Sequence, residues 1–186
     1  MAIKIIGCGG IGFWLAVGLS RTGLEVTIFD DDDLTGGLGH TRLPVARSNT
    51  HKVDLLIGFL RTQMGGNMPT TVFEKFSGKE TEVGDLVVDC SDMSGKARGA
   101  IYRRVIKAGG RYVRVSYDGA NHTVVVAEGL PITVDQAAAG YSSVPSLALS
   151  LMAGGVGAEC VAEMANKPVG FVEFQVSLAD YLPVGE

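Results

Sequence analysis

The chain contains 186 residues, 46% of them hydrophobic, which suits one domain with a sizeable core. Its 16 basic and 20 acidic residues give a net charge of −4, so the overall field favours neither nucleic acid phosphates nor an anionic membrane surface. Glycine is in excess, with 26 residues, or about 14% of the chain. The mean hydropathy of +0.25 excludes a disordered low-complexity chain, so these glycines need a structural or functional explanation.

The cysteines and the apolar segments indicate where the protein works. Cys8, Cys90 and Cys160 are an odd, scattered set that makes neither a disulfide framework nor a CxxC metal site, and they fit a reducing cytosol. No run of 18 apolar residues is present, and the N-terminus lacks the layout of a signal peptide. We therefore expect a cytoplasmic protein that binds neither membranes nor nucleic acid.

Short β-branched runs alternate with segments of helical periodicity along the chain. The pattern predicts strands over residues 2–6, 25–29, 70–76, 85–90 and 111–117, and helices over 11–22, 46–63 and 96–108. A strand over 122–127 is expected to return antiparallel, followed by a loop over 130–143, a helix over 144–166 and an edge strand over 171–178. This order predicts an α/β fold with a doubly wound, mostly parallel sheet and antiparallel C-terminal strands. We expect one domain over 1–186, with a core over 1–118 and an extension over 119–186.

A glycine-rich loop joins the first predicted strand to the first predicted helix. Its sequence, Gly7-Cys8-Gly9-Gly10-Ile11-Gly12, fits G-x-G-x-x-G, and Asp30 follows 18 residues after Gly12, at the end of the second strand. Gly7 permits a tight turn, Gly9 lets the backbone approach a phosphate, and Gly12 allows close helix packing. Asp30 can accept hydrogen bonds from a ribose. The pattern predicts a Rossmann-like nucleotide site, but NAD, FAD and ATP all satisfy it.

Further charged residues are predicted at the same edge of the sheet. Asp32, Arg42 and Lys52 follow the second strand, and Asp92 follows the fourth strand in the sequence DCSD. Hydride transfer has no general need for such a set. Phosphoryl or nucleotidyl transfer uses cations to neutralise phosphate charge and a carboxylate to hold magnesium.

The order and spacing of these motifs resemble the ubiquitin-activating superfamily, in particular its small bacterial ThiF/MoeB-type members. The resemblance rests on GCGGIG, the acidic turn DDDDL, the arginine in HTRLP, the pair Lys52-Val53 and DCSDMSGKAR, and it covers about residues 3–126. It implies ATP and Mg²⁺ as cofactors, with Asp30 on the ribose, Arg42 and Lys52 on the phosphates, and Asp92 on the metal. Asp32 is a further candidate in the nucleotide site.

The resemblance also implies a reaction and a partner. The C-terminal carboxylate of a small ubiquitin-like (β-grasp) carrier protein, or of a peptide, would attack the α-phosphate of ATP, and the enzyme would be a homodimer. The crossover loop expected near residues 130–143 contains no cysteine, and Cys160 is expected to pack in a helix. We therefore expect adenylylation without a thioester step.

Several features depart from the family pattern and keep two alternatives open. Met93 stands where the family usually has asparagine, the asparagine and glutamine around Arg42 are missing, and the helix preceding the first strand and the CxxC pairs are absent. The first alternative is an NAD-dependent oxidoreductase, although no clear catalytic His, Tyr or Lys set supports it. The second is a catalytically reduced module that binds a nucleotide or a partner. A local basic cluster is most often a solvated face but could receive an acidic partner protein: Arg103, Arg104, Lys107, Arg111 and Arg114.

Overall fold

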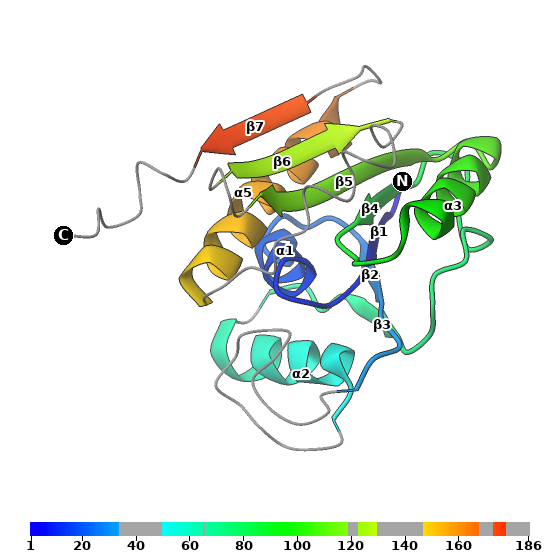
Figure 1. Ribbon diagram of the computed structural model, residues 1–186. Coiled ribbons are helices and arrows are strands. Elements are labelled where there is room, and N and C mark those ends of the chain that lie inside the picture. Colours follow the sequence, from blue (N-terminus) through cyan, green and yellow to red (C-terminus); the bar gives the residue numbers. More distant parts are fainter. Residues whose placement is uncertain (34–49, 65, 119–122, 130–146, 168–172, 178–186) are drawn as a thin grey trace.

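A seven-stranded sheet forms the centre of the described part of the protein (Figure 1). The computed structural model describes residues 1–33, 50–64, 66–118, 123–129, 147–167 and 173–177. The strands are β1 (Ile3–Ile6), β2 (Val26–Phe29), β3 (Thr70–Val72), β4 (Leu86–Asp89), β5 (Arg111–Asp118), β6 (Thr123–Glu128) and β7 (Glu173–Ser177). Their spatial order is β3-β2-β1-β4-β5-β6-β7. Strands β1 to β5 are parallel, whereas β6 and β7 are antiparallel to their neighbours, which confirms the predicted Rossmann-like α/β fold.

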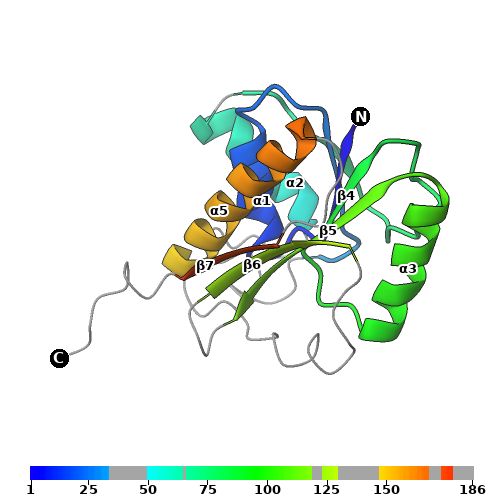
Figure 2. The ribbon, with the colours of Figure 1, turned by 90° about the horizontal axis from the view of Figure 1, so that it is seen from above.

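Helices cover both faces of this sheet (Figure 2). One face packs against α1 (Gly12–Leu19), α2 (Lys52–Phe59), which continues as the π-helical turn η1 (Leu60–Met64), and α5 (Leu147–Asn166). The other face packs against α3 (Gly95–Lys107). Central strands buried on both faces are mostly apolar, which explains the β-branched run that predicted β1 and the continuous apolar run that predicted β4.

The strands end in register, and this alignment defines the edge at which a site can form. The pairing places Phe29, Ile6, Asp89 and Arg114 side by side across β2, β1, β4 and β5. Strands β1, β2 and β4 stop at or near this row. Strand β5 continues through residues 115–118 because β6 pairs with it there. The ends of β2, β1 and β4 therefore form a floor at the carboxyl edge, and β5 extends beyond this floor along one side.

Several predicted elements are longer than those observed. Helix α1, predicted over 11–22, spans Gly12–Leu19, and two other differences have a clear cause. The second helix begins at Lys52 rather than residue 46, because His51 is extended and forms an isolated antiparallel bridge with Asp33. Strand β3 ends at Val72, because its partner β2 ends at the opposite residue, Phe29, and offers no further pairing. The predicted loop over 130–143, and residues 46–49 of the predicted helix, lie outside the described residues.

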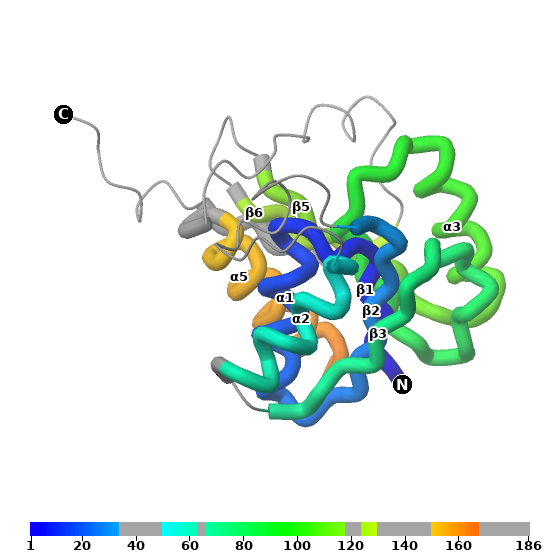
Figure 3. The backbone as a smooth tube through the Cα atoms, turned by 90° about the horizontal axis from the view of Figure 1, so that it is seen from below, coloured from blue at the N-terminus to red at the C-terminus, as the bar shows by residue number. Residues whose placement is uncertain are grey.

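Helix α5 lies beside α1 (Figure 3). Its glycines let it lie close to both α1 and β5. A Cβ added to Gly154 would lie 2.3 Å from the Cβ of Trp14, and one added to Gly157 would lie 2.9 Å from a methyl carbon of Val115. Gly18 of α1 is similarly close to α5, since its added Cβ would lie 2.6 Å from the Cβ of Ala158. Part of the glycine excess therefore serves helix packing.

Adjacent glycines of α5 provide a test of this packing. Gly154→Ala should destabilise the fold by about 1–3 kcal/mol, because the new methyl group overlaps α1. The matched control is Gly155→Ala, since no atom lies within 4 Å of the added Cβ and alanine favours a helix by about 1 kcal/mol. Urea denaturation should therefore shift the two midpoints in opposite directions. Equal shifts would contradict the close approach.

Candidate functional site

A cavity of about 1060 Å³ lies at the carboxyl edge of the parallel strands. Ligand sites of open α/β sheets form at this edge, where the strand order changes direction, here between β1 and β4. The predicted site residues that line the cavity are Gly7, Gly9, Gly10, Asp30, Asp32, Lys52 and Asp92. Gly12 lies behind the loop at the start of α1, and Arg42 lies outside the described residues.

The loop between β1 and α1 has a geometry that requires glycine at two positions. Gly7 has a φ of +92°, and a Cβ added to it would lie 3.1 Å from the Cα of Ser91. A Cβ added to Gly12 would lie 1.9 Å from the carbonyl oxygen of Gly7. Gly9 and Gly10 then line the cavity, at the N-terminal end of α1. A helix N-terminus with small residues in front of it favours a bound anion such as a phosphate.

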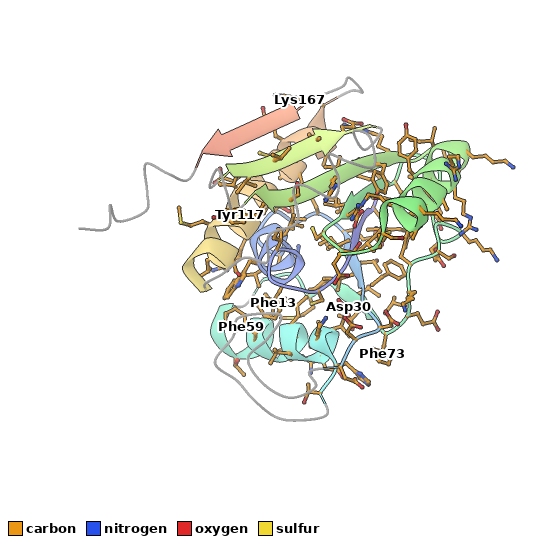
Figure 4. All side chains as sticks on the ribbon, in the orientation of Figure 1. Phe13, Asp30, Phe59, Phe73, Tyr117 and Lys167 are labelled. Atoms are coloured by element: carbon orange, nitrogen blue, oxygen red, sulfur yellow. The ribbon has the colours of Figure 1, made fainter. Side chains whose placement is uncertain are left out.

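Asp30 lies at the end of β2, next to the start of α2 (Figure 4). Its carboxylate accepts hydrogen bonds from the backbone N–H of Cys8, at 2.6 Å, and from that of Asp32, at 2.8 Å. Its side chain is only 7% exposed, and this burial raises the pKa of Asp30, although the two N–H donors oppose the rise. Each carboxylate oxygen keeps a further lone pair, so Asp30 can also accept a ribose hydroxyl from the cavity.

Of the two predicted phosphate-binding cations, Arg42 and Lys52, the structure describes Lys52. Its side chain is 5% exposed. Its ammonium lies 2.6 Å from a carboxylate oxygen of Asp32 and 3.9 Å from one of Asp30. Edge-on packing of Phe13 against Phe59, with centroids 5.6 Å apart, holds α2 against α1 (Figure 4). The acidic turn and this contact therefore place the ammonium beside the glycine loop.

The rest of the acidic turn is also ion-paired. Asp31 lies 3.2 Å from the ammonium of Lys75, and Asp33 pairs with the imidazole of His51. Lys75 follows β3 and His51 immediately precedes α2, so these contacts link the turn after β2 to both elements.

A buried polar cluster below the loop after β4 was missed by the sequence analysis. Asp89 is 1% exposed. One of its oxygens accepts hydrogen bonds from Arg98 Nε at 2.7 Å and the Tyr112 hydroxyl at 2.6 Å, and the other accepts from the N–H and hydroxyl of Ser91 at 2.9 and 2.6 Å. Arg98 also donates to the Ser91 carbonyl oxygen at 3.2 Å. Burial, followed by the charge of Asp89, raises the pKa of Tyr112, so its hydroxyl stays a donor.

This Asp89 cluster decides which carboxylate of DCSD faces the cavity. Both carboxylate oxygens of Asp89 accept hydrogen bonds from protein groups, and the side chain is buried. Asp92, in contrast, is exposed and lines the cavity. Met93 also lines the cavity and packs against the apolar cluster under α3, so it forms an apolar wall where the family pattern has a polar residue. Arg98 forms a buried salt bridge with Asp89.

The three cysteines are poor nucleophiles, and the basic cluster is divided between the two faces of the sheet. Burial raises the pKa of all three thiols, those of Cys8, Cys90 and Cys160, so none is activated as a nucleophile. The basic cluster does not form one surface. Arg111 points to the α5 side, where it pairs with Glu128 at 2.6 Å and donates to a carbonyl of α5, while the arginines of α3 lie on the other face.

Metal binding by the protein alone is not supported among the described residues, which contain no group of three or more His, Cys, Asp or Glu side chains able to hold an ion. Magnesium, however, commonly binds through one or two carboxylates plus phosphate oxygens of a substrate, and Asp92 fits that mode. Within the same residues, no helix is long and apolar enough to cross a membrane.

No family model and no curated protein matches this sequence. Solved structures share its fold. E. coli MccB, crystallised with AMPCPP and MccA, has a TM-score of 0.64 and 16% identity, over 88% of this chain and 56% of MccB. PaaA has a TM-score of 0.62 and 18% identity, over 96% of this chain and 61% of PaaA. HcgE from Methanothermobacter marburgensis, bound to guanylylpyridinol and ATP, has a TM-score of 0.58 and 15% identity, over 89% of this chain and 96% of HcgE.

These likenesses establish the fold alone, because every identity is below 20%. The chain spans little more than half the length of MccB. Two of the three similar structures hold ATP or an ATP analogue, and the cavity of this protein lies at the edge of the sheet where such a fold binds ligands.

The Asp89 cluster can be tested through stability. Arg98→Met should cost about 3–5 kcal/mol of unfolding free energy, because it leaves the Asp89 carboxylate buried without its cation. Tyr112→Phe removes a single hydrogen bond to a charged group and should cost about 1.5–3 kcal/mol. The matched control is Arg103→Met on the exposed face of the same helix, which should change stability by no more than about 0.5 kcal/mol. Equal urea midpoints for Arg98→Met and Arg103→Met would contradict the assignment.

Proposed function

We propose that this protein binds ATP and Mg²⁺ and transfers AMP to the C-terminal carboxylate of a peptide or a small ubiquitin-like protein. The observation that carries the proposal is the cavity itself, where the glycine loop, Asp30, Lys52 and Asp92 come together at one edge of the sheet. The similarity of the sequence motifs to ThiF/MoeB-type enzymes supports the same function. So does the fold shared with MccB, which was crystallised with AMPCPP and the peptide MccA.

Each charged residue of the predicted site has a proposed role. Asp30 accepts the ribose hydroxyls, and the glycine loop at the N-terminus of α1 receives the phosphates. Lys52 neutralises phosphate charge, together with Arg42. Bound Mg²⁺ would add further neutralisation of the phosphates, held by Asp92, with Asp32 assisting in the nucleotide site. Binding of ATP would let the Lys52 ammonium exchange part of its contact with Asp32 for phosphate oxygens.

The proposed reaction needs no general base. A carboxylate oxygen of the acceptor attacks the α-phosphorus, and the bond from that phosphorus to the bridging oxygen breaks. Pyrophosphate leaves with the electron pair, and no proton moves because the acceptor is already ionised. Catalysis then depends on alignment of the two substrates and on stabilisation of phosphate charge. The unreactive thiols fit a reaction that stops at the acyl-adenylate.

Assembly as a homodimer in the cytoplasm, implied by the same resemblance, belongs to this proposal as well. Sedimentation of the purified chain tests the oligomeric state.

Nucleotide binding and turnover can be separated by two substitutions. Lys52→Met should weaken ATP binding at least roughly tenfold, because a charge-assisted contact to phosphate contributes about 1.5–3 kcal/mol. Asp92→Asn should abolish magnesium-dependent exchange of pyrophosphate into ATP while leaving metal-free ATP binding unchanged. Calorimetry measures the first effect, and exchange with panels of peptides and β-grasp proteins measures the second.

Matched controls on exposed sites are Lys107→Met and Asp54→Asn, which remove the same charges outside the cavity. Both should retain binding and exchange. Binding of NAD in preference to ATP would instead support an oxidoreductase. ATP binding without exchange against any acceptor would indicate a module without turnover, and undiminished exchange in Asp92→Asn would contradict the magnesium role.

A further inference from the structure

The cavity extends beyond the strands to which the nucleotide is assigned. Ribose and phosphates belong at the ends of β2 and β1, where Asp30 and the glycine loop lie. From there the cavity continues across the end of β4 to β5. Four consecutive residues of β5 line that far part of it: Arg114, Val115, Ser116 and Tyr117. The β4–β5 half of the cavity is therefore open to a second substrate.

The shape of this half follows from the strand pairing. Arg114 is in register with Asp89, the last residue of β4, so it lies level with the floor of the cavity. Residues 115–118 rise above that floor because β6 pairs with them. Arg114 and Ser116 are two positions apart and share one face of β5. The far half therefore has a wall that carries a guanidinium at its base and a hydroxyl above it.

The distribution of cations distinguishes the two halves. Among the described residues lining the cavity, Lys52 and Lys75 bind Asp32 and Asp31 at the end of β2, and Arg104 donates to the Ser77 carbonyl oxygen after β3. Arg114 is the described cation that lines the cavity from β5.

The charge of Arg114 reaches the end of β4. Arg114 is in register with Asp89, the last residue of β4, and it lines the same cavity as Cys90 and Ser91. Positive charge is thus present on the side of the cavity away from the proposed ribose site.

We infer that the β4–β5 half of the cavity binds the terminal carboxylate of the acceptor, with Arg114 as the recognising cation and Ser116 as a neutral donor beside it. The inference rests on the proposed function, because an adenylylated acceptor must present a free carboxylate. A guanidinium forms a planar, paired contact with a carboxylate, and its several N–H groups let it keep another partner at the same time.

The loop contacts place this carboxylate site next to the phosphates. Gly7 of the glycine loop lies against Ser91 at the end of β4, with the added Cβ of Gly7 only 3.1 Å from the Cα of Ser91. Phosphates at the glycine loop and a carboxylate at β5 are therefore separated by the β4 loop alone. Such an arrangement brings two reactants together in one cavity, which is the main requirement of a transfer without a general base.

Arg114 could bind anionic oxygens of two kinds, those of the acceptor carboxylate and those of the ATP triphosphate. The experiment separates them with a pair of probes, N-acetylglycylglycine and its C-terminal amide, which differ only in the carboxylate. Binding of each probe to the full chain is measured by NMR titration, with and without AMPCPP. ATP binding is measured on the same proteins by calorimetry.

The expected result is that the wild-type protein binds the acid roughly tenfold or more tightly than the amide, as one charge-assisted contact predicts. Arg114→Gln should remove this preference and leave ATP affinity unchanged. Arg114→Lys should keep part of it, because lysine supplies charge without the planar paired contact. The matched control is Arg103→Gln, which removes an exposed arginine outside the cavity and should keep the full preference. Thermal melting of each variant establishes that it is folded.

Equal binding of acid and amide by the folded wild-type protein would overturn the assignment. So would an Arg114→Gln variant that loses ATP affinity but keeps the preference for the acid, since Arg114 would then bind the triphosphate. Failure of the proposed function is distinguishable from both. In that case the wild-type protein would bind no ATP, while the preference for the acid, measured without AMPCPP, would still depend on Arg114.

Discussion

The site depends on how closely the loops after β1 and β4 approach each other. Gly7 lies against the backbone of Ser91, and Ser91 is held from below by Asp89 and Arg98. A side chain at position 7 would separate the loops, and loss of either buried charge would release the loop after β4. One contact therefore sets the distance between the groups assigned to phosphate and the loop that carries Asp92.

Two ion pairs, one below the cavity and one lining it, differ in how far water can reach them. The buried charge of Asp89 is neutralised by Arg98 and its carboxylate also accepts from Tyr112. Asp89 therefore stabilises the end of β4 and offers no free carboxylate to a ligand. Lys52 is nearly as buried, but its partner Asp32 is mostly exposed, so water or a ligand can compete for the contact. A permanent ion pair thus supports the loop after β4, and an exchangeable one lies beside the glycine loop. This difference follows from burial, since a charge contact weakens where water can reach it.

The antiparallel extension gives the edge of the sheet its asymmetry. In a purely parallel sheet the strands would end together and the cavity would be a shallow trough. Pairing with β6 carries β5 past that row and creates a wall on one side. The same extension is packed from behind by α5, whose glycines Gly154 and Gly157 let it lie close to α1 and β5. The position of the wall thus depends on the close packing of a helix remote in sequence.

Much of the fold could be predicted from local patterns, because strand and helix periodicity and glycine stops are properties of neighbouring residues. Two of the boundaries that differed depend on partners. Strand β3 is short because β2 ends opposite Val72, and α2 starts late because His51 pairs with Asp33. Neither partner is visible in the local sequence. The basic residues were likewise expected on one face because they are close in sequence. Side chains alternate along β5, so Arg111 and Arg114 lie on opposite faces of the sheet.

The amino-acid sequence by itself determined the order of strands and helices, the glycine loop after β1, and the residues Asp30 and Asp92 that follow strands ending at one edge. These depend on period, spacing and the glycine requirement of a tight turn. The tertiary structure alone decided that Asp89 is buried with Arg98 and Tyr112, that Lys52 lies between two aspartates, and that Arg114 lines the far half of the cavity. Those relations join residues distant in sequence, and their energies depend on burial, which exists only after the sheet has assembled.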